Sequence, residues 1–423
     1  MRLTPEQLSG EGEDGGLIHF VDTAFLTSQQ PERVGIAVSG GGDSMALLHV
    51  AWRWSVLTGV PIEAVTVNHG LRAEASDEAD MVAQYCADNG IHHQILLWDG
   101  AAAKGNIAAA GRDARYSLIA DWANTRGIGH VMLGHTADDI AETFLMRLAR
   151  KSGVDGLAMM DTTFERNGIH WARPLWQQER AELRNYLKRH GVTWVDDPTN
   201  EDETHERPKA RKVLDALEPL GINREALKNV AQNMSSARNT LEHYTSQEAE
   251  RLVRVEGGDV IIKTRPMPPV PQEIERRILV SALQFVGGGA YAPRFDAMVD
   301  LDVALNLGKP HTLAGCLITP EKDEIRIARE YNAVKDHEVE QGFVWDNRWH
   351  LVGPLTAKAT IRALGESITQ IPDWRETGLS RASLMASPAV FRGEWLISAP
   401  IAGLQNGFRA RIVADFHSFL LSR

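Results

Sequence analysis

The feature that most constrains the fold is a short apolar segment followed directly by a glycine-rich turn and a helical pattern. Residues 34–38 (VGIAV) are rich in β-branched side chains, as in a buried parallel strand. The turn 39–44 (SGGGDS) follows, and 45–49 begin the helical pattern. Three glycines let the backbone turn sharply, and a helix N-terminus attracts negative charge. The segment therefore predicts an anion site, with Asp43 or Ser44 as the helix N-cap.

Apolar segments and helical patterns then alternate along the chain. Strands are expected at 62–67, 93–97 and 130–133, followed by helices at 74–89, 107–126 and 140–150. Such alternation predicts βαβ units, an α/β fold with a Rossmann-like parallel sheet, in which ligands bind beyond the carboxyl ends of the strands. Three polar clusters follow strands there: 39–44, 68–72 and 135–139.

Composition excludes several classes of protein. The net charge is −11, so an RNA partner would have to bind through local basic patches. Cys86 and Cys316 are far apart, which argues against a disulfide framework or a structural zinc site. No apolar run reaches the roughly 18 residues of a membrane span. The N-terminal segment is acidic and polar, unlike a signal peptide. We expect a soluble cytoplasmic protein.

Acidic and basic pairs at helical spacing are candidates for chemistry. Asp138 and Glu142 would share a helix face and could act in catalysis. Alternatively, Asp138 caps its helix and Glu142 pairs with Arg147 or another surface charge. Arg112 and Arg115 suit a phosphate or a carboxylate, unless they form a solvated face.

The glycine turn narrows the choice of anion. It lacks the lysine of a Walker loop and does not fit the dinucleotide pattern GxGxxG. It resembles the SGGxDS loop of the N-type ATP pyrophosphatases, which cleave ATP between the α and β phosphates. The alternative is a glycine turn without a ligand.

Further segments resemble the tRNA(Ile)-lysidine synthetases, in the order of that family. They are VNHGLRAEASDEADMVAQYC, NIAAAGRDARY, GHTADDIAETFLMRLARKSGVDGLAMM and ARPLWQQERAELRNYLKRHGVTWVDDPTNED. The resemblance covers roughly residues 34–215. It implies that ATP adenylates the C2 oxygen of the wobble cytidine in an isoleucine tRNA with a CAU anticodon. The ε-amine of free L-lysine then attacks C2 and expels AMP. Implied cofactors are ATP and Mg²⁺; the protein could be a monomer or a homodimer.

The resemblance also implies roles for residues. ATP would be bound by Ser39, Gly40, Gly41, Gly42, Asp43, Ser44 and His69, with Asp43 near Mg²⁺. The implied catalytic residues are Asp43, Arg112, Asp138 and Asp139. Lysine or substrate would be bound by Arg112, Arg115, His135 and Glu142. His69 and His135 could also be ordinary core or surface residues.

Local basic groups could meet the phosphates of tRNA. The candidates are Arg180, Arg184, Arg207, Lys209, Arg211 and Lys212. Arg180 and Arg184 recur at helical spacing, and the alternative for both groups is a solvated helix face. Pro208 interrupts the second group and leaves its local geometry open.

The chain is divided by pattern into four parts. These are a flexible lead-in with one short helix (1–32), the catalytic domain (33–215), a mostly helical tRNA-docking domain with a short sheet (216–333) and a mixed or β-rich domain (334–423). A two-stranded hairpin is expected at 311–318 and 324–328, and further strands at 342–352, 359–364 and 391–397. Core positions are expected for Trp345, Trp349, Trp374 and Trp395.

Two other functions stay open at this point. One is a related tRNA-modifying enzyme that thiolates its substrate, although neither cysteine is well placed for that chemistry. The other is a catalytically silent RNA-binding relative, against which the intact SGGGDS and DDIAET segments speak.

Overall fold

The computed structural model describes residues 2–25, 31–68, 74–98, 107–196, 206–265, 267–289, 291–354 and 358–421. The chain divides into two compact units, Met1–Arg238 and Asn239–Arg423. The boundary lies within one long helix, α10 (Arg224–Leu252). The finer predicted limits at residues 33, 216 and 334 stay predictions. None of the described helices is long and apolar enough to cross a membrane.

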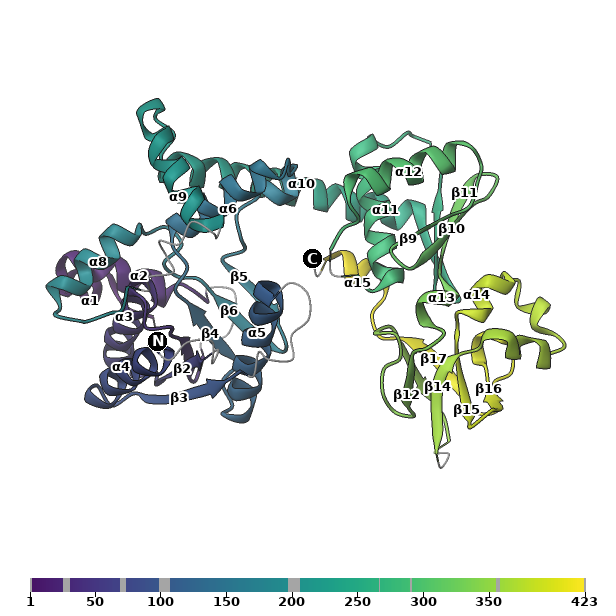
Figure 1. Cartoon of the computed structure of the whole chain (residues 1–423), viewed down its shortest axis with the longest axis horizontal. Coiled ribbons are helices and arrows are strands. Elements are labelled where there is room, and N and C mark those ends of the chain that lie inside the picture. Colours follow the sequence, from purple (N-terminus) through teal and green to yellow (C-terminus); the bar gives the residue numbers. More distant parts are fainter. Residues whose placement is uncertain are drawn as a thin grey trace. The chain divides into compact units, whose positions relative to one another are not determined.

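A mainly parallel sheet forms the centre of the first unit (Figure 1), in the order β3-β2-β1-β4-β6-β5. Its strands are β1 (Val34–Ala37), β2 (Ile62–Asn68), β3 (His92–Leu97), β4 (His130–Leu133), β5 (Thr163–Arg166) and β6 (Ile169–Ala172). All neighbours pair in parallel except β5, which is antiparallel to β6. The predicted α/β parallel sheet is confirmed, whereas β5 and β6 were not expected. Because β1 lies between β2 and β4, the turns after β1 and β4 meet where strand order reverses.

Helices cover both faces of this sheet. On one face, Ile36 and Met132 share a core with the side chains of α2, α3, α4 and α8. On the other face, Val65 and Val131 pack against α5. The helices are α2 (Gly15–Asp22), α3 (Gly42–Thr58), α4 (Glu74–Asp88), α5 (Ile107–Thr125) and α8 (Arg180–Arg189). Burial on both faces explains why the strands read as continuous apolar runs.

The N-terminal segment differs from the expected flexible lead-in. It forms α1 (Pro5–Gly10), with a capping box on Thr4, and then α2. Asp14 lies before α2 and is buried. Its carboxylate accepts from Arg53 at 2.6 Å, from Arg189 at 2.7 Å and contacts His190 at 2.7 Å. These bonds fasten the segment to α3 and to the end of α8.

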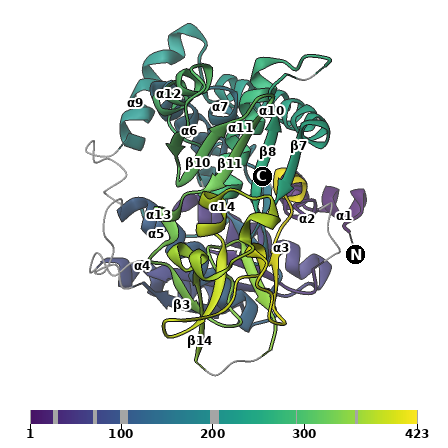
Figure 2. The ribbon, with the colours of Figure 1, turned by 90° about the vertical axis from the view of Figure 1, so that its right-hand side faces the viewer.

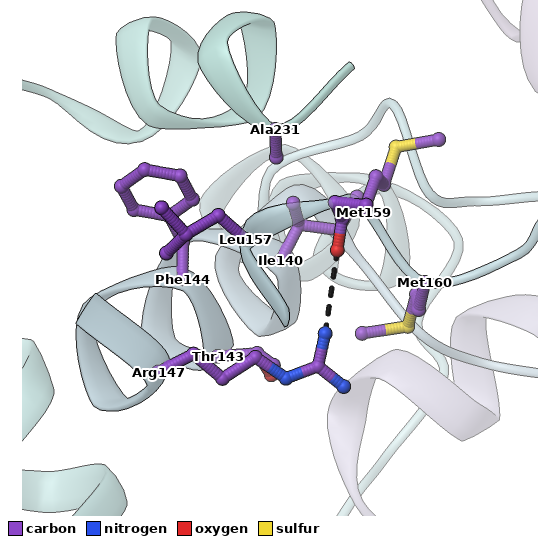
Figure 3. Close-up of a pocket in the computed structure, with 9 residues that line it drawn as sticks. Ile140, Thr143, Phe144, Arg147, Leu157, Met159, Met160 and Ala231 are labelled. Atoms are coloured by element: carbon purple, nitrogen blue, oxygen red, sulfur yellow. Dashed lines mark hydrogen bonds between the residues drawn. The ribbon is translucent and has the colours of Figure 1, made fainter. Parts of the chain in front are cut away.

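The remaining helices of the first unit pack around a second apolar cluster. They are α6 (Ala137–Ala149), α7 (Val154–Leu157), α9 (Glu206–Leu217) and the start of α10. Pro208 does not interrupt α9, because it lies in the first turn, where a backbone N–H has no helical partner. This cluster encloses a small cavity of about 10 Å³. Figure 3 shows the residues that line it, which are mainly apolar. Arg147 bonds the carbonyl of Ala158 at its edge.

The second unit begins with a sheet in the order β7-β8-β11-β10-β9, beside α11 (Gln272–Gly287), as Figure 2 shows. Its strands are β7 (Val253–Glu256), β8 (Asp259–Lys263), β9 (His311–Leu313), β10 (Cys316–Pro320) and β11 (Glu324–Arg329). Helix α12 (Phe295–Asn306) precedes β9. The expected two-stranded hairpin is wrong in one respect: Ala314 and Gly315 have φ of 53° and 70° and split its first strand into β9 and β10.

The C-terminal part is mixed but mainly β. One sheet runs β12-β14-β15-β16, and β13 pairs with β17. Its elements are α13 (Tyr331–Val334), β12 (Glu338–Glu340), β13 (Trp349–Val352), β14 (Ala359–Ala363), α14 (Arg381–Met385), β15 (Pro388–Arg392), β16 (Trp395–Ser398), β17 (Arg409–Ile412) and α15 (Phe416–Leu421). The expected strand at 391–397 is a hairpin. Trp345 and Trp349 are buried and Trp374 is half-buried, but Trp395 is 79% exposed, so its expected core position was wrong.

Candidate functional site

The glycine turn after β1 is held by its own serines. Gly40 has φ of 87°, a conformation that favours glycine. The Ser44 hydroxyl accepts from the Ser39 amide at 3.1 Å and donates to the Gly41 carbonyl at 2.9 Å. Gly41 is the N-cap of α3 and makes no side-chain cap bond, so the expected caps, Asp43 and Ser44, lie inside the first turn. The first-turn amides therefore keep their capacity for an anion.

Two other segments press against this turn. The Val195 amide donates to the Gly40 carbonyl at 3.0 Å, which places the chain after α8 alongside the turn. Gly134, after β4, approaches still more closely. A Cβ on Gly134 would lie 3.0 Å from the Asp43 carbonyl oxygen and 3.0 Å from Ser44 Cα. The turns after β1 and β4 thus meet with no room for a side chain between them.

Three buried carboxylates lie at the start of α6. Asp138, Asp139 and Glu142 are 7%, 5% and 1% exposed. The cap of the helix is Thr136, whose amide donates to Asp139 Oδ2 at 3.0 Å. The alternative of Asp138 as the cap is therefore wrong. Glu142 does not pair with Arg147 either, since Arg147 bonds the carbonyl of Gly156 at 2.9 Å.

Arginines from three helices surround these carboxylates. Arg180, the first residue of α8, links the glycine turn to α6. Its Nε is 2.9 Å from Asp43 Oδ2 in the turn, and its Nη1 is 3.2 Å from Glu142 Oε1 on α6. Its amide donates to Asp138 Oδ2 at 2.7 Å. Arg211 pairs with Glu142 at 2.6 Å, and Arg224 pairs with Asp138 at 2.9 Å. Arg207 pairs with Asp139 at 3.3 Å and lies 3.9 Å from Glu142 Oε2.

Two carboxylate oxygens of this cluster are buried without a hydrogen-bond partner among the described residues, Asp43 Oδ1 and Glu142 Oε2. Burial raises the pKa of Asp43, against the opposing charge of Arg180. Burial also acts to raise the pKa of Asp139, but the positive charges of Arg207, His135 and Arg180 outweigh it and the pKa is lowered. The cluster therefore combines a carboxylate kept ionised, Asp139, with unused acceptor capacity on Asp43 and Glu142, which suits a cation.

A second, cationic cluster surrounds Tyr116 on α5. The guanidinium carbons of Arg112, Arg115 and Arg166 lie 5.6, 6.0 and 4.5 Å from the centre of its ring. Burial and the charges of Arg112 and Arg207 lower the pKa of Arg115, against Tyr116. Arg166 pairs with Asp113 at 3.0 Å. Several arginines held together suit an anionic ligand.

His135 connects the two clusters. It lies in the turn between β4 and α6, half-buried, and its Nδ1 accepts from Arg173 Nε at 3.2 Å. Burial is the main cause that lowers the pKa of His135 to about 3; Asp139 opposes this shift, and the charges of Arg173, Arg112 and Arg115 add to it. The ring is therefore neutral at physiological pH.

Comparison with known proteins identifies the family. The PP-loop domain family matches residues 19–217. The tRNA(Ile)-lysidine synthase of Ruegeria pomeroyi is 44% identical over 403 residues, covering 94% of this chain and 96% of that protein. The protein of the same name from Wolbachia pipientis is 35% identical and covers 77% of each chain. That of Mesorhizobium japonicum is 34% identical, covering 91% and 88%. The chain belongs to the tRNA(Ile)-lysidine synthase family.

The residues expected from this family fall into three groups. Brought together around the glycine turn are Ser39, Gly40, Gly41, Gly42, Asp43, Ser44, Asp138, Asp139, Glu142, Arg180, Arg207 and Arg211. Arg112 and Arg115 belong to the Tyr116 cluster. Arg173 contacts both His135 and the Tyr116 hydroxyl, and so links His135 to this cluster. Arg184 pairs with Asp196, and Lys209 and Lys212 are exposed on α9. His69 lies outside the described residues.

Sequence reasoning missed Arg173 and Arg224 in this lysidine synthase site. Arg173 directly follows β6, a strand that was not expected, so its position at the carboxyl edge of the sheet was not recognised. A proline after it and the apolar run before it were the available signals. Arg224 begins α10, and no local pattern connects it with Asp138, 86 residues earlier.

Mg²⁺ is implied by the family. Among the residues that the structure describes, no three His, Cys, Asp or Glu side chains are arranged to hold a metal ion. Of the two buried carboxylate oxygens without a hydrogen-bond partner among the described residues, Asp43 Oδ1 belongs to the glycine turn. It fits a Mg²⁺ ion that takes one or two protein carboxylates and completes its shell with phosphate oxygens and water.

Proposed function

We propose that this chain joins free L-lysine to C2 of the wobble cytidine in tRNA(Ile) with a CAU anticodon, using ATP and releasing AMP and pyrophosphate. The product, lysidine, would change decoding from AUG to AUA. The observation that carries the proposal is the meeting of the uncapped start of α3 with buried carboxylates from α6 at the point where strand order reverses.

In the first step, the amides of the glycine turn would bind the phosphates of ATP. Asp43 would hold Mg²⁺ through its unpartnered oxygen, and the ion would offset the phosphate charge. The start of α3 adds the positive end of the helix dipole. These groups would stabilise the pyrophosphate as it leaves. Attachment of AMP then makes the C2 oxygen of the cytidine a good leaving group.

Lysine carries both signs of charge, and the site offers both partners. The arginines around Tyr116 would bind its carboxylate, and the acids of α6 would bind its side-chain nitrogen. Glu142 is the best placed acid, because its Oε1 accepts from Arg180 and Arg211 while its buried Oε2 accepts no hydrogen bond from the described residues and lies 3.9 Å from Arg207 Nε. The amine must be neutral to attack C2, so an acid or a desolvated environment has to lower its pKa.

The basic residues expected to bind tRNA fall into two kinds. Arg180, Arg207 and Arg211 are engaged with site carboxylates, so we propose that they organise the site. Lys209 and Lys212 are exposed on α9, and Arg184 pairs with the exposed Asp196. These three would contact RNA phosphates, and their removal should weaken binding with a smaller salt dependence.

The test is lysine incorporation. Protein, ATP, Mg²⁺ and radiolabelled lysine are incubated with a tRNA(Ile) transcript bearing CAU. We expect label in the RNA, lost when the wobble C is changed to U. Asp43→Ala should abolish incorporation and ATP–pyrophosphate exchange, whereas Asp121→Ala on the exposed face of α5 should retain both. Wild-type protein that labels no transcript would refute the proposal, and full exchange by Asp43→Ala would remove the role of Asp43.

Thiolation of tRNA is a weaker alternative. The chain has two cysteines, Cys86 on α4 and Cys316 on β10, and both are buried. Burial raises the pKa of each thiol to about 12. A thiolating enzyme needs a reactive thiolate, and neither residue supplies one.

A further inference from the structure

Arg173 is held on every side, although no sequence motif singles it out. It is 5% exposed. Its Nη2 is 3.5 Å from the Tyr116 hydroxyl, and its Nη1 donates to the carbonyl of Asp161. Its Cζ lies 4.4 Å from the centre of the Phe164 ring. The remaining nitrogen, Nε, donates to His135 Nδ1 at 3.2 Å. A guanidinium fixed at four points can hold one orientation of a neighbouring ring.

The bond between Arg173 and His135 decides which ring nitrogen carries the proton. An arginine has donors and no acceptor, and it stays protonated. His135 Nδ1 must therefore present its lone pair to Arg173 Nε. In a neutral imidazole the single proton then lies on Nε2. Nε2 makes no hydrogen bond within the part of the chain that the structure describes, so its N–H is free for a ligand.

We infer that Arg173 is a positioning residue that fixes His135 as a neutral hydrogen-bond donor through Nε2, directed to a substrate oxygen in the lysidine reaction. The inference rests on the proposed function for the identity of the reaction. In this arrangement His135 cannot take the proton from lysine, because Nδ1 accepts a hydrogen bond from Arg173 and Nε2 already carries a proton. The oxygens that such a donor fits are those of a phosphate, a carboxylate or the cytidine carbonyl.

The charged surroundings of His135 agree with this assignment. Arg173 faces it from the end of β6, Arg112 and Arg115 face it from α5, and Asp139 faces it from α6. The three cations oppose a second proton on the ring and outnumber the one acid. Burial acts in the same direction. The ring thus stays neutral across the pH range in which a lysine amine could be made reactive.

The tautomer can be measured without any substrate. Protein labelled with ¹⁵N-histidine is examined by long-range ¹H–¹⁵N correlation, with the His135 signals assigned by their loss in His135→Gln. We expect one neutral tautomer with the proton on Nε2, unchanged from pH 5 to pH 9. A proton on Nδ1, or a titration within this range, would overturn the inference. Since wild-type protein is used, the result does not depend on whether lysine is incorporated.

Substitutions separate a donor from a base. Gln places an amide N–H near the position of Nε2 but cannot act as a base, so His135→Gln should keep kcat within about 10-fold of wild type. His135→Ala should lose about 10² or more in kcat, as for loss of a preorganised donor. Equal losses in the two variants would contradict the donor role. His130→Gln, at the other end of β4, is the matched control and should be unchanged.

Arg173 is tested through its effect on the ring. Arg173→Met should produce a mixture of the two tautomers and raise the pKa of His135, because it removes both the donor to Nδ1 and a positive charge. A single Nε2–H tautomer retained in a folded Arg173→Met protein would show that Arg173 does not position the ring. Absence of lysine incorporation by wild type, together with the expected tautomer, would refute the proposed function and leave the Arg173–His135 assignment standing.

Discussion

The close approach of β4 to the start of α3 makes Gly134→Ala a sharp test of the site. The new Cβ would lie 3.0 Å from the Asp43 carbonyl oxygen, 3.0 Å from Ser44 Cα and 3.1 Å from the Asp43 carbonyl carbon. All three atoms belong to backbone, so no side-chain rotation can relieve the contact. Either the turn after β4 or the first turn of α3 must move by a few tenths of an ångström.

The magnitude follows from this geometry. Forcing one extra methyl group into a well-packed site costs about 1–3 kcal/mol. If β4 and α3 keep their positions, the cost is seen as a lower free energy of unfolding. If α3 moves, the amides of the glycine turn lose their alignment, and about 1.4 kcal/mol of that strain equals a tenfold weaker affinity for ATP. We expect both effects, with ATP affinity reduced about 10-fold or more.

The measurement is calorimetric titration of ATP, with thermal unfolding on the same samples. Gly129→Ala is the matched control, because Gly129 precedes the same strand and its Cβ would meet no atom within 4 Å. It should bind ATP as wild type does. If Gly134→Ala matched Gly129→Ala in both affinity and stability, the β4 turn would not support the glycine turn, and our account of the site would fail.

Three further predictions concern charge and burial. Arg180→Met should lower the free energy of unfolding by about 3 kcal/mol or more, because it leaves Asp43 and the buried Glu142 without a shared partner. Arg184→Met, which breaks an exposed pair, should lower it by at most about 1 kcal/mol. Chemical denaturation of both variants measures the difference. Burial opposes ionisation of Asp14, but Arg53, His190 and Arg189 lower its pKa from 3.8 to about 2. Its contribution to stability is therefore present above about pH 4 and is lost as pH falls toward 2. Asp14→Asn should flatten the dependence of stability on pH across that range. Native protein at pH 8 should resist iodoacetamide at Cys86 and Cys316, and unfolded protein should take up two labels; fast labelling of the native state would reopen the thiolation alternative.

The sequence was sufficient to predict the central sheet and its ligand edge. Strands β1 to β4 lie close to their expected limits, because each is an apolar run between helical patterns. Strand β5 was missed because Thr163–Arg166 is polar and alternates half-buried with exposed positions at the edge of the sheet. The hairpin of β15 and β16 was read as one strand, because its short turn at Gly393 and Glu394 separates two apolar segments by only a few residues.

The candidate site was predicted only in part. The glycine turn and the acids of α6 are local motifs, so their positions after strands could be deduced. The arginines are different, because their partners are distant in sequence: Arg180 is 137 residues from Asp43, and Arg211 is 69 residues from Glu142. Spacing on a helix cannot distinguish a surface arginine that binds RNA from an arginine that pairs with a buried acid.

The pairing of the site carboxylates has a consequence for binding. Asp43 and Glu142 share one guanidinium, that of Arg180, and each keeps one buried oxygen that accepts no hydrogen bond from the residues that the structure describes. An unsatisfied buried acceptor is unfavourable by about 1–3 kcal/mol, and more when it is charged. Among the described residues, no donor forms a hydrogen bond with either oxygen. A cationic ligand that reaches both oxygens removes the cost, so part of the affinity for such a ligand comes from the relief of strain already present in the free site. A neutral ligand of the same shape does not gain this contribution to its binding free energy. The site therefore prefers a positive charge where Arg180 bridges Asp43 and Glu142.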